Sequence, residues 1–122
     1  MYGGRIPVEF NKDIGQYAYE TDGLIFVWDE EPTDGFMDTV KMLSKNYYEH
    51  LNSIIDFILP DIKETYGNVS SEDVRNNLGK PIIDYDRGRV SYCEQTFADC
   101  HIFEFEFLDD KFEEVQYFSM NG

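Results

Sequence analysis

The segment His101-Ile102-Phe103-Glu104-Phe105-Glu106-Phe107 carries the information that decides the fold class. Successive side chains of a strand point to opposite faces of a sheet, so the three phenylalanines share one face and the two glutamates share the other. This pattern is typical of an antiparallel strand with one face on a core and the other in water. We therefore predict a half-buried strand over residues 100–108.

Turn sequences separate further strand-like segments on both sides of this one. Asp22-Gly23 is a strong signal for a two-residue hairpin, because both central residues of a type I′ turn need positive φ. Asp86-Arg87-Gly88 and Asp109-Asp110-Lys111 have the composition of tight turns. The expected strands are residues 5–10, 16–21, 24–29, 82–86, 89–95, 100–108 and 112–120. The strand at 24–29 is apolar on both faces, which predicts a central position covered on both sides.

The middle of the chain has the periodicity of helices. Apolar residues recur at spacings of three and four over residues 34–59, which predicts one long amphipathic helix. Proline removes a backbone donor, so Pro60 is expected to kink or end that helix, with residues 62–66 as a short extra turn and Gly67 as a stop. A short second helix is expected after Ser70 or Ser71, with Asp73 in a capping-box position and Gly79 at its end.

These elements predict a single α+β domain over residues 1–122, in the order β-β-β-α-α-β-β-β-β. Hairpin connections favour one curved antiparallel β-sheet of about six or seven strands. The long helix is expected to pack its apolar stripe on one face of the sheet, with the short second helix beside it. The other face is expected to be partly open to water and to carry much of the acid.

The charge of the chain bears directly on its partners. It has 25 Asp and Glu residues against 10 Lys and Arg, a formal net charge of −15. Such a balance disfavours nucleic acid and anionic membrane as partners and favours a cationic protein, although acidity for solubility alone explains it equally well. The chain shows no apolar run of signal-peptide or membrane-span length, which indicates a cytoplasmic protein.

The sequence gives little support for catalysis, metal or cofactor binding. The candidate nucleophiles and bases are Cys93, Cys100, His50 and His101. Adjacent strand residues point to opposite faces, so Cys100 cannot readily use His101, and no metal-ligand spacing of Cys and His is present. We predict a non-enzymatic protein without a cofactor or metal.

Two acidic clusters and the tyrosines are the remaining candidates for function. One cluster is Asp29-Glu30-Glu31 with Asp34. The other lies on the last hairpin and consists of Glu104, Glu106, Asp109, Asp110, Glu113 and Glu114. Concentrated like charges cost stability, which a basic partner would relieve; helix capping by Asp34 and protection of the sheet edge are the alternatives. Tyrosine beside carboxylate is typical of protein-binding surfaces. The predicted partner-binding residues are Asp29, Glu30, Glu31, Glu104, Glu106, Asp109, Glu114, Tyr92 and Tyr117.

Two parts of the chain resemble a known class of protein. The first is Ser71-Glu72-Asp73-Val74-Arg75-Asn76-Asn77-Leu78-Gly79-Lys80-Pro81, followed by Ile82-Ile83 and Val90-Ser91-Tyr92. The second is residues 102–107 with residues 112–122. Together they resemble the short-helix-to-strand unit and closing hairpin of small bacterial immunity proteins of the polymorphic-toxin or contact-dependent inhibition type. The resemblance covers the C-terminal half and implies neutralisation of a toxin in the cytoplasm.

The leading hypothesis is therefore an immunity protein, a monomer or weak dimer, that neutralises a basic toxin domain such as a nuclease through its acidic surface. The second hypothesis is a small-molecule-binding or enzymatic α+β domain, with a pocket between the long helix and the sheet lined by Trp28, Tyr47 and Tyr92. The third is a module that self-associates along an edge strand.

Overall fold

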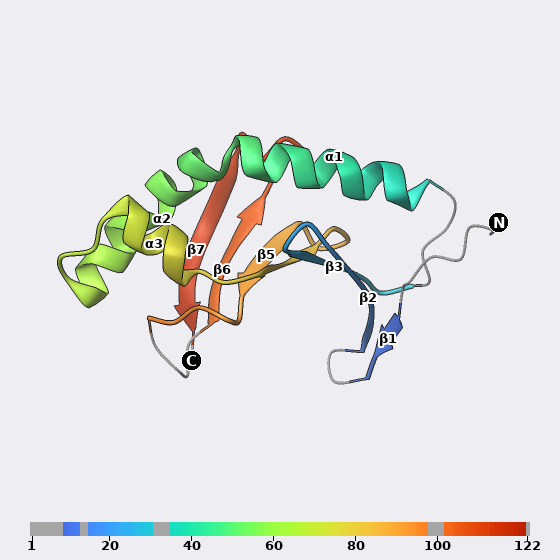
Figure 1. The fold of residues 1–122 in the computed structure, drawn as a ribbon, viewed down its shortest axis with the longest axis horizontal. Helices are drawn as coiled ribbons and strands as arrows, with labels where there is room; N and C mark the ends of the chain where they lie inside the picture. The colour runs from blue at the N-terminus through green and yellow to red at the C-terminus, as the bar shows by residue number, and fades with distance from the viewer. Residues whose placement is uncertain (1–8, 13–14, 31–34, 98–101, 122) are drawn as a thin grey trace.

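A computed structural model describes residues 9–12, 15–30, 35–97 and 102–121 of the chain. In these ranges it forms an α+β fold with an open, mostly antiparallel sheet and three helices (Figure 1). The elements are β1 (Glu9–Asn11), β2 (Gln16–Thr21), β3 (Leu24–Trp28), α1 (Phe36–Glu49), α2 (Leu51–Tyr66), α3 (Ser71–Asn77), β4 (Pro81–Asp84), β5 (Arg89–Tyr92), β6 (Ile102–Phe107) and β7 (Val115–Asn121).

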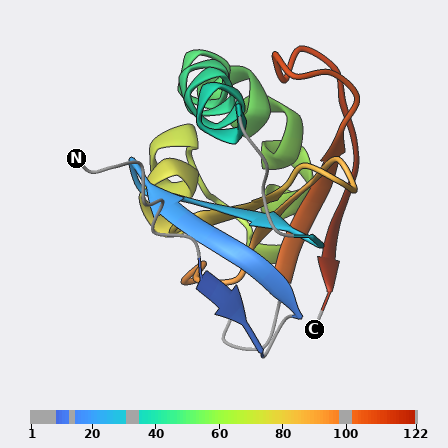
Figure 2. The same ribbon diagram turned by 90° about the vertical axis from the view of Figure 1, so that its right-hand side faces the viewer.

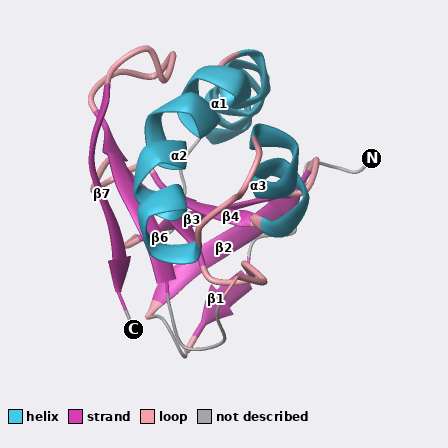
Figure 3. Cartoon of the chain, turned by 90° about the vertical axis from the view of Figure 1, so that its left-hand side faces the viewer, coloured by secondary structure: helices cyan, strands magenta, loops and turns pink. Residues whose placement is uncertain are grey.

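The strands lie in the sheet in the order β1-β2-β3-β4-β5-β6-β7. All neighbouring pairs are antiparallel except β3 and β4, which are parallel, with Ile25, Phe26 and Val27 opposite Ile82, Ile83 and Asp84. The expectation of a fully antiparallel sheet is therefore wrong at this pair. The reason is the long helical connection between the two strands, which returns the chain to the same end of the sheet before β4 begins. Figure 3 shows the three helices on one side of the curved sheet.

The hairpin between β2 and β3 is confirmed. Asp22 and Gly23 both have positive φ, at 55° and 77°, as the type I′ turn requires. Thr21 pairs with Leu24 directly beside the turn, so the register of the hairpin is the one the dipeptide predicts.

The prediction of one long helix over residues 34–59 is wrong, and of the two outcomes expected at Pro60, a kink or an end, the end does not occur. The helix divides at His50, whose φ of −107° and ψ of 9° are not helical and which closes α1 and opens α2. Pro60 lies inside α2. The buried stripe of Ile54, Ile58 and Ile62 continues past the proline, and this packing offsets the one backbone hydrogen bond that proline removes. Gly67 ends α2, as expected.

The short helix α3 begins at a complete capping box, which confirms the prediction for Ser70. The Ser70 Oγ accepts from the Asp73 amide at 3.1 Å, and an Asp73 carboxylate oxygen accepts from the Ser70 amide at 3.0 Å. Gly79, at φ 75°, follows the helix. An added Cβ there would lie 2.9 Å from the backbone carbonyl oxygen of Glu94, so glycine is required for both reasons.

The core lies between the helices and the inward face of the sheet. Phe103, Phe105 and Phe107 of β6 are buried, whereas Glu104 and Glu106 between them are only partly covered, so the predicted alternation is confirmed. The helices contribute the stripe of Val40, Leu43, Tyr47, Ile54, Ile58 and Ile62. In β3, Leu24 and Phe26 belong to this core, and Val27, which points to the other face, is buried as well.

Candidate functional site

The parallel pairing of β3 and β4 determines where the acidic residues gather. Because these two strands run in the same direction, both end at the same end of the sheet, where β5 and β7 begin and β6 ends. Figure 2 shows the end of β3, the β4–β5 turn and the β6–β7 turn along one side of the molecule. The carboxylates at this end, which we name the acidic rim, are those of Asp29, Glu30, Asp86, Asp109, Asp110, Glu113 and Glu114.

Three contacts made by the β4–β5 turn join the two acidic clusters that are separate in the sequence. The Asp29 amide donates to a carboxylate oxygen of Asp86 at 3.0 Å, and Arg87 Nη1 lies 2.8 Å from Asp29 Oδ1. On the other side of the turn, the Tyr85 hydroxyl donates to Asp110 Oδ2 at 3.4 Å. The end of β3 and the last hairpin therefore form one continuous surface.

Asp29 is held locally, so its charge is already partly neutralised. Its Oδ1 accepts from Arg87 Nη1 and from Gln16 Nε2, the latter at 3.1 Å. Hydrogen bonds from Arg87 and then Gln16 hold the pKa of Asp29 below its ordinary value. Arg87 and Gln16 also bind Asp84, at 2.9 and 3.1 Å, so one guanidinium and one amide link two carboxylates.

Asp109 has a structural role within the β6–β7 turn. Its two carboxylate oxygens accept from the amides of Lys111, Glu113 and Glu114 at 2.9, 3.2 and 2.8 Å. Partial burial raises the pKa of Asp109, but the three amide donors outweigh it and leave the pKa below its ordinary value. Asp109 therefore orders the turn, and the hydrogen bonds within the turn use both of its carboxylate oxygens.

The carboxylates of the rim that remain directed to water are those of Glu30, Glu113 and Glu114. All three residues are exposed, and their carboxylates take part in no hydrogen bond with another residue in the described ranges. They are thus the groups of the rim that a partner can reach without breaking an internal contact. Glu31 and Asp34, predicted as part of the same cluster, lie outside the described residues.

Glu104 and Glu106 lie apart from the rim, on the outer face of the sheet. Glu104 accepts from the Ser91 hydroxyl at 3.0 Å and lies 3.8 Å from Arg89, while Glu106 accepts from the Gln116 amide at 3.1 Å. Arg89, Glu104, Glu106, Tyr117 and Ser119 line a hollow of about 310 Å³ on this face. The two glutamates are half-buried and have internal partners, so they are less available to an incoming cation than Glu30, Glu113 and Glu114.

The predicted tyrosines have different positions. Tyr92 is fully buried, and its hydroxyl lies 2.5 Å from that of Tyr47, which is also buried. The expectation that Tyr92 contacts a partner is therefore wrong, since a side chain that fills the core cannot also reach another protein. Tyr117, in contrast, is 72% exposed and has a φ of 54° at an irregularity in the pairing of β6 with β7.

The candidate residues for nucleophilic chemistry and metal binding do not form a centre in the part of the chain that the structure describes. Cys93 is exposed, and desolvation and then the nearby Glu104 and Glu94 raise the pKa of its thiol. His50 lies at the junction of α1 and α2, with Nδ1 3.1 Å from the Asn46 carbonyl. Cys100 and His101 lie outside the described residues. Across the described ranges, no group of three His, Cys, Asp or Glu side chains is placed to hold a metal ion.

None of the helices in the described ranges has both the length and the apolar character needed to span a bilayer.

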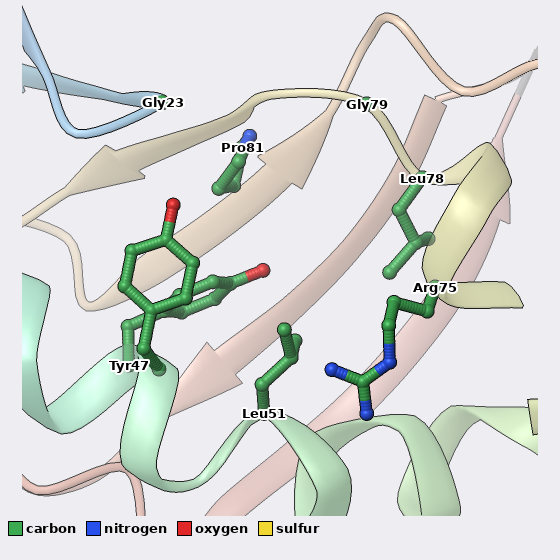
Figure 4. A pocket seen from close by; sticks show the side chains of 8 residues that line it. Gly23, Tyr47, Leu51, Arg75, Leu78, Gly79 and Pro81 are labelled. Carbon is green, nitrogen blue, oxygen red and sulfur yellow. The ribbon is translucent and has the colours of Figure 1, made fainter. Parts of the chain in front are cut away.

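The pocket predicted between the helices and the sheet has a different position and lining. Trp28 packs edge-on against Phe36 and Tyr92 lies in the core, and neither is among the residues that line the described pocket beside the helices. Tyr47 does line one, of about 320 Å³, beyond the filled core and between the α1–α2 junction, α3 and the start of β4 (Figure 4). Sequence reasoning missed this pocket because its walls come from turns and helix ends that no periodicity brings together.

Comparison of the chain with protein-family models, with curated proteins and with solved structures finds no match.

Proposed function

We propose that this chain is a binding protein that inhibits a basic protein, and that the acidic rim is the surface that binds the partner. The observation that supports this proposal is the union of two acidic clusters into one surface. Seven carboxylates meet there, with Arg87 and Lys111 as the basic residues of the same turns. Arg87 is already bound to Asp29 and Asp84, so the remaining charge of the rim is strongly negative.

The partner that fits this surface best is a cationic toxin domain, with the chain acting as its immunity protein in the bacterial cytoplasm. The resemblance of the C-terminal half to small immunity proteins favours this partner over other basic proteins. An acidic rim would also suit a partner that binds nucleic acid, because such a protein presents a basic surface. In this proposal the chain acts by covering that surface and performs no chemistry of its own.

The physical role of the rim is to guide and hold the partner. Complementary charge raises association rates by about 10-fold to 1000-fold and the effect falls with ionic strength. The carboxylates of Glu30, Glu113 and Glu114 supply this attraction, since these residues are exposed and their carboxylates take part in no hydrogen bond within the described ranges. Tyr117 and the hollow beside it offer an aromatic contact on the adjoining face.

The experiment combines the chain with the protein encoded by the neighbouring reading frame. The two are co-expressed to test for rescue of growth, and their association rate is measured by stopped flow at about 50 and 500 mM salt, a range over which surface charges become strongly screened. We expect rescue, and we expect an association rate that falls at least tenfold with salt. An association rate that does not change with salt contradicts the role of the rim.

A matched pair of triple variants separates the rim from net charge. In one, Glu30→Gln, Glu113→Gln and Glu114→Gln neutralise the rim. In the control, Asp56→Asn, Asp61→Asn and Glu64→Gln remove the same charge from the exposed side of α2. We expect only the rim variant to lose most of the salt-dependent part of the association rate. Equal effects of the two variants would mean that overall charge, and no particular surface, attracts the partner.

A further inference from the structure

The last three strands of the sheet carry a hollow on the side away from the helices. Figure 3 shows the three helices together on the opposite side of the sheet. Between the pairs Glu104–Ser119 and Glu106–Gln116, two residues of β7 lie opposite one residue of β6, which is a β-bulge. The hollow beside this bulge has a volume of about 310 Å³. We name it the outer hollow; its lining is Arg89, Glu104, Phe105, Glu106, Tyr117 and Ser119.

The charged groups of the outer hollow do not balance. Glu104 accepts from the Ser91 hydroxyl and lies 3.8 Å from Arg89, so this carboxylate already has a cation beside it. Glu106 accepts from the neutral side-chain amide of Gln116 at 3.1 Å, and this is the one hydrogen bond of its carboxylate within the described ranges. Two carboxylates against one guanidinium leave one negative charge, which a single cationic group would balance.

Tyr117 gives the outer hollow an aromatic wall. The residue is 72% exposed, so its ring is not needed to fill the core. A guanidinium suits an aromatic ring beside a carboxylate, because its planar group stacks on the ring and donates two parallel hydrogen bonds to the carboxylate. The ammonium of lysine has no planar face and makes no such paired contact. The hollow therefore favours arginine over lysine.

Exposed apolar side chains lie beyond both ends of the outer hollow. Ile102 and Leu108 are 41% and 57% exposed, and the alternation along β6 places them on the same face as Glu104 and Glu106. The Leu108 amide donates to the Glu114 carbonyl at 2.9 Å, so the strand pairing continues to this residue. The two apolar residues are roughly 20 Å apart, at about 3.4 Å per residue. This face thus has an acidic centre between two apolar ends.

We infer that the outer hollow takes an arginine side chain from an extended segment of the basic partner, with apolar residues on either side of that arginine. The guanidinium donates to the Glu106 carboxylate and stacks on Tyr117, while the apolar side chains pack on Ile102 and Leu108. A second copy of this chain does not complement the face, because it brings the same net charge of −15. The nature of the partner rests on the proposed function, but the outer hollow shares no residue with the acidic rim.

The test uses the heptapeptide acetyl-Leu-Ser-Ser-Ser-Arg-Ser-Leu-amide, titrated into the full chain and followed by two-dimensional amide NMR. When the peptide is extended, its two leucines and its arginine share one face, at the spacing of Ile102, Leu108 and Glu106. We expect saturable shifts at the amides of Glu106, Leu108 and Tyr117. Citrulline in place of arginine keeps the shape without the charge and should bind about tenfold more weakly, with lysine between the two.

A second peptide controls for attraction by net charge alone. It has the same composition but carries its arginine at the first position, so the arginine and the leucines no longer match the face. We expect it to bind more weakly than the first peptide, although both have the same charge. Equal affinity of the two peptides would mean that the acidic chain attracts any cationic peptide, which overturns the inference.

Matched substitutions test the residues of the outer hollow. Glu106→Gln removes the carboxylate and should weaken binding of the first peptide about tenfold. Tyr117→Asn removes the ring at a backbone conformation that asparagine tolerates, and should weaken binding about threefold. Glu64→Gln, at an exposed position of α2, removes the same charge as Glu106→Gln and should leave binding unchanged.

The outcomes separate this inference from the proposed function. The inference is overturned if the first peptide gives no saturable shifts, if shifts are confined to the rim residues Glu113 and Glu114, or if Glu106→Gln and Glu64→Gln behave alike. If the peptide binds as expected but the neighbouring protein shows neither growth rescue nor salt-dependent association, the outer hollow stands and the proposed function fails. Rescue that is accompanied by no peptide binding leaves the proposed function and overturns the inference.

Discussion

The carboxylate of Asp29 and the guanidinium of Arg87 lie 2.8 Å apart, although 58 positions separate them in the sequence. The same guanidinium atom lies 2.9 Å from Asp84. The arginine therefore ties the end of β3 to the β4–β5 turn at the centre of the acidic rim.

Removal of this arginine should loosen the centre of the rim. In Arg87→Gln we expect the pKa of Asp29 to rise toward its ordinary value, because its main hydrogen bond is lost, and the urea midpoint of unfolding to fall. A folded-state pKa below the unfolded value stabilises the protein above that unfolded pKa and no longer does so once the pH has fallen through the folded pKa. The stabilities of wild type and variant should therefore converge in acid. Carboxyl-carbon NMR and urea unfolding at several pH values measure both effects.

Arg87→Lys is the control for this prediction. It keeps the charge but replaces the planar guanidinium with a flexible ammonium, so its stability should fall between those of wild type and Arg87→Gln. If the plots of stability against pH for wild type and Arg87→Gln stay parallel down to the most acidic pH, the ion pair does not account for the difference in stability.

The backbone at Tyr117 should be strained. Its φ of 54° is a left-handed conformation that costs a non-glycine residue about 1 kcal/mol, and its ring is mostly exposed. Asparagine tolerates this conformation, so Tyr117→Asn should raise the free energy of unfolding by about 0.5–1 kcal/mol. Tyr117→Ala, which keeps the strain and removes the ring, should not. Denaturant unfolding compares the two, and equal stabilities would argue against strain at this position.

The buried hydroxyl pair should show energetic coupling. Tyr47→Phe or Tyr92→Phe alone leaves one buried hydroxyl without its partner and should cost about 1–2 kcal/mol. The double variant should cost about 1 kcal/mol less than the sum, because no unpaired hydroxyl remains. A double-mutant cycle from urea unfolding measures this coupling, and strict additivity would contradict it.

Alkaline titration should separate these two tyrosines from the others. Burial raises the pKa of both Tyr47 and Tyr92 far above the ordinary value of tyrosine, so the folded state retains protons that the unfolded state loses. Stability should therefore fall as the pH rises above about 10. Ultraviolet titration should show the two groups ionising only with unfolding. If all nine tyrosines titrate together in the folded protein, the prediction is wrong.

Much of the secondary structure follows from local signals. Asp22-Gly23 specifies its turn because both residues accept positive φ, and Ser70 with Asp73 closes a capping box within three residues. The helix boundary at His50 could not be predicted in this way, because the apolar stripe continues through it. Pro60 was misleading for a related reason, since packing of the isoleucines outweighs the local cost of proline.

Only part of the candidate site could be predicted from the sequence. The acidic clusters were visible as runs of charge, but the choice of Tyr92 as a contact residue was wrong because burial depends on neighbours from other elements. The pocket had no local signal at all, since Gly23, Arg75 and Pro81 come from three separate segments.

The alternation of β6, the hairpin at Asp22-Gly23, the cap of α3 and the net charge of −15 follow from the sequence directly, because each depends on residues a few positions apart or on composition. The parallel pairing of β4 with β3 depends on the folded arrangement of the whole chain. That pairing comes from packing of the helical connection against the sheet. It brings Asp29 to Arg87 and Tyr85 to Asp110, and so joins two acidic clusters into one rim.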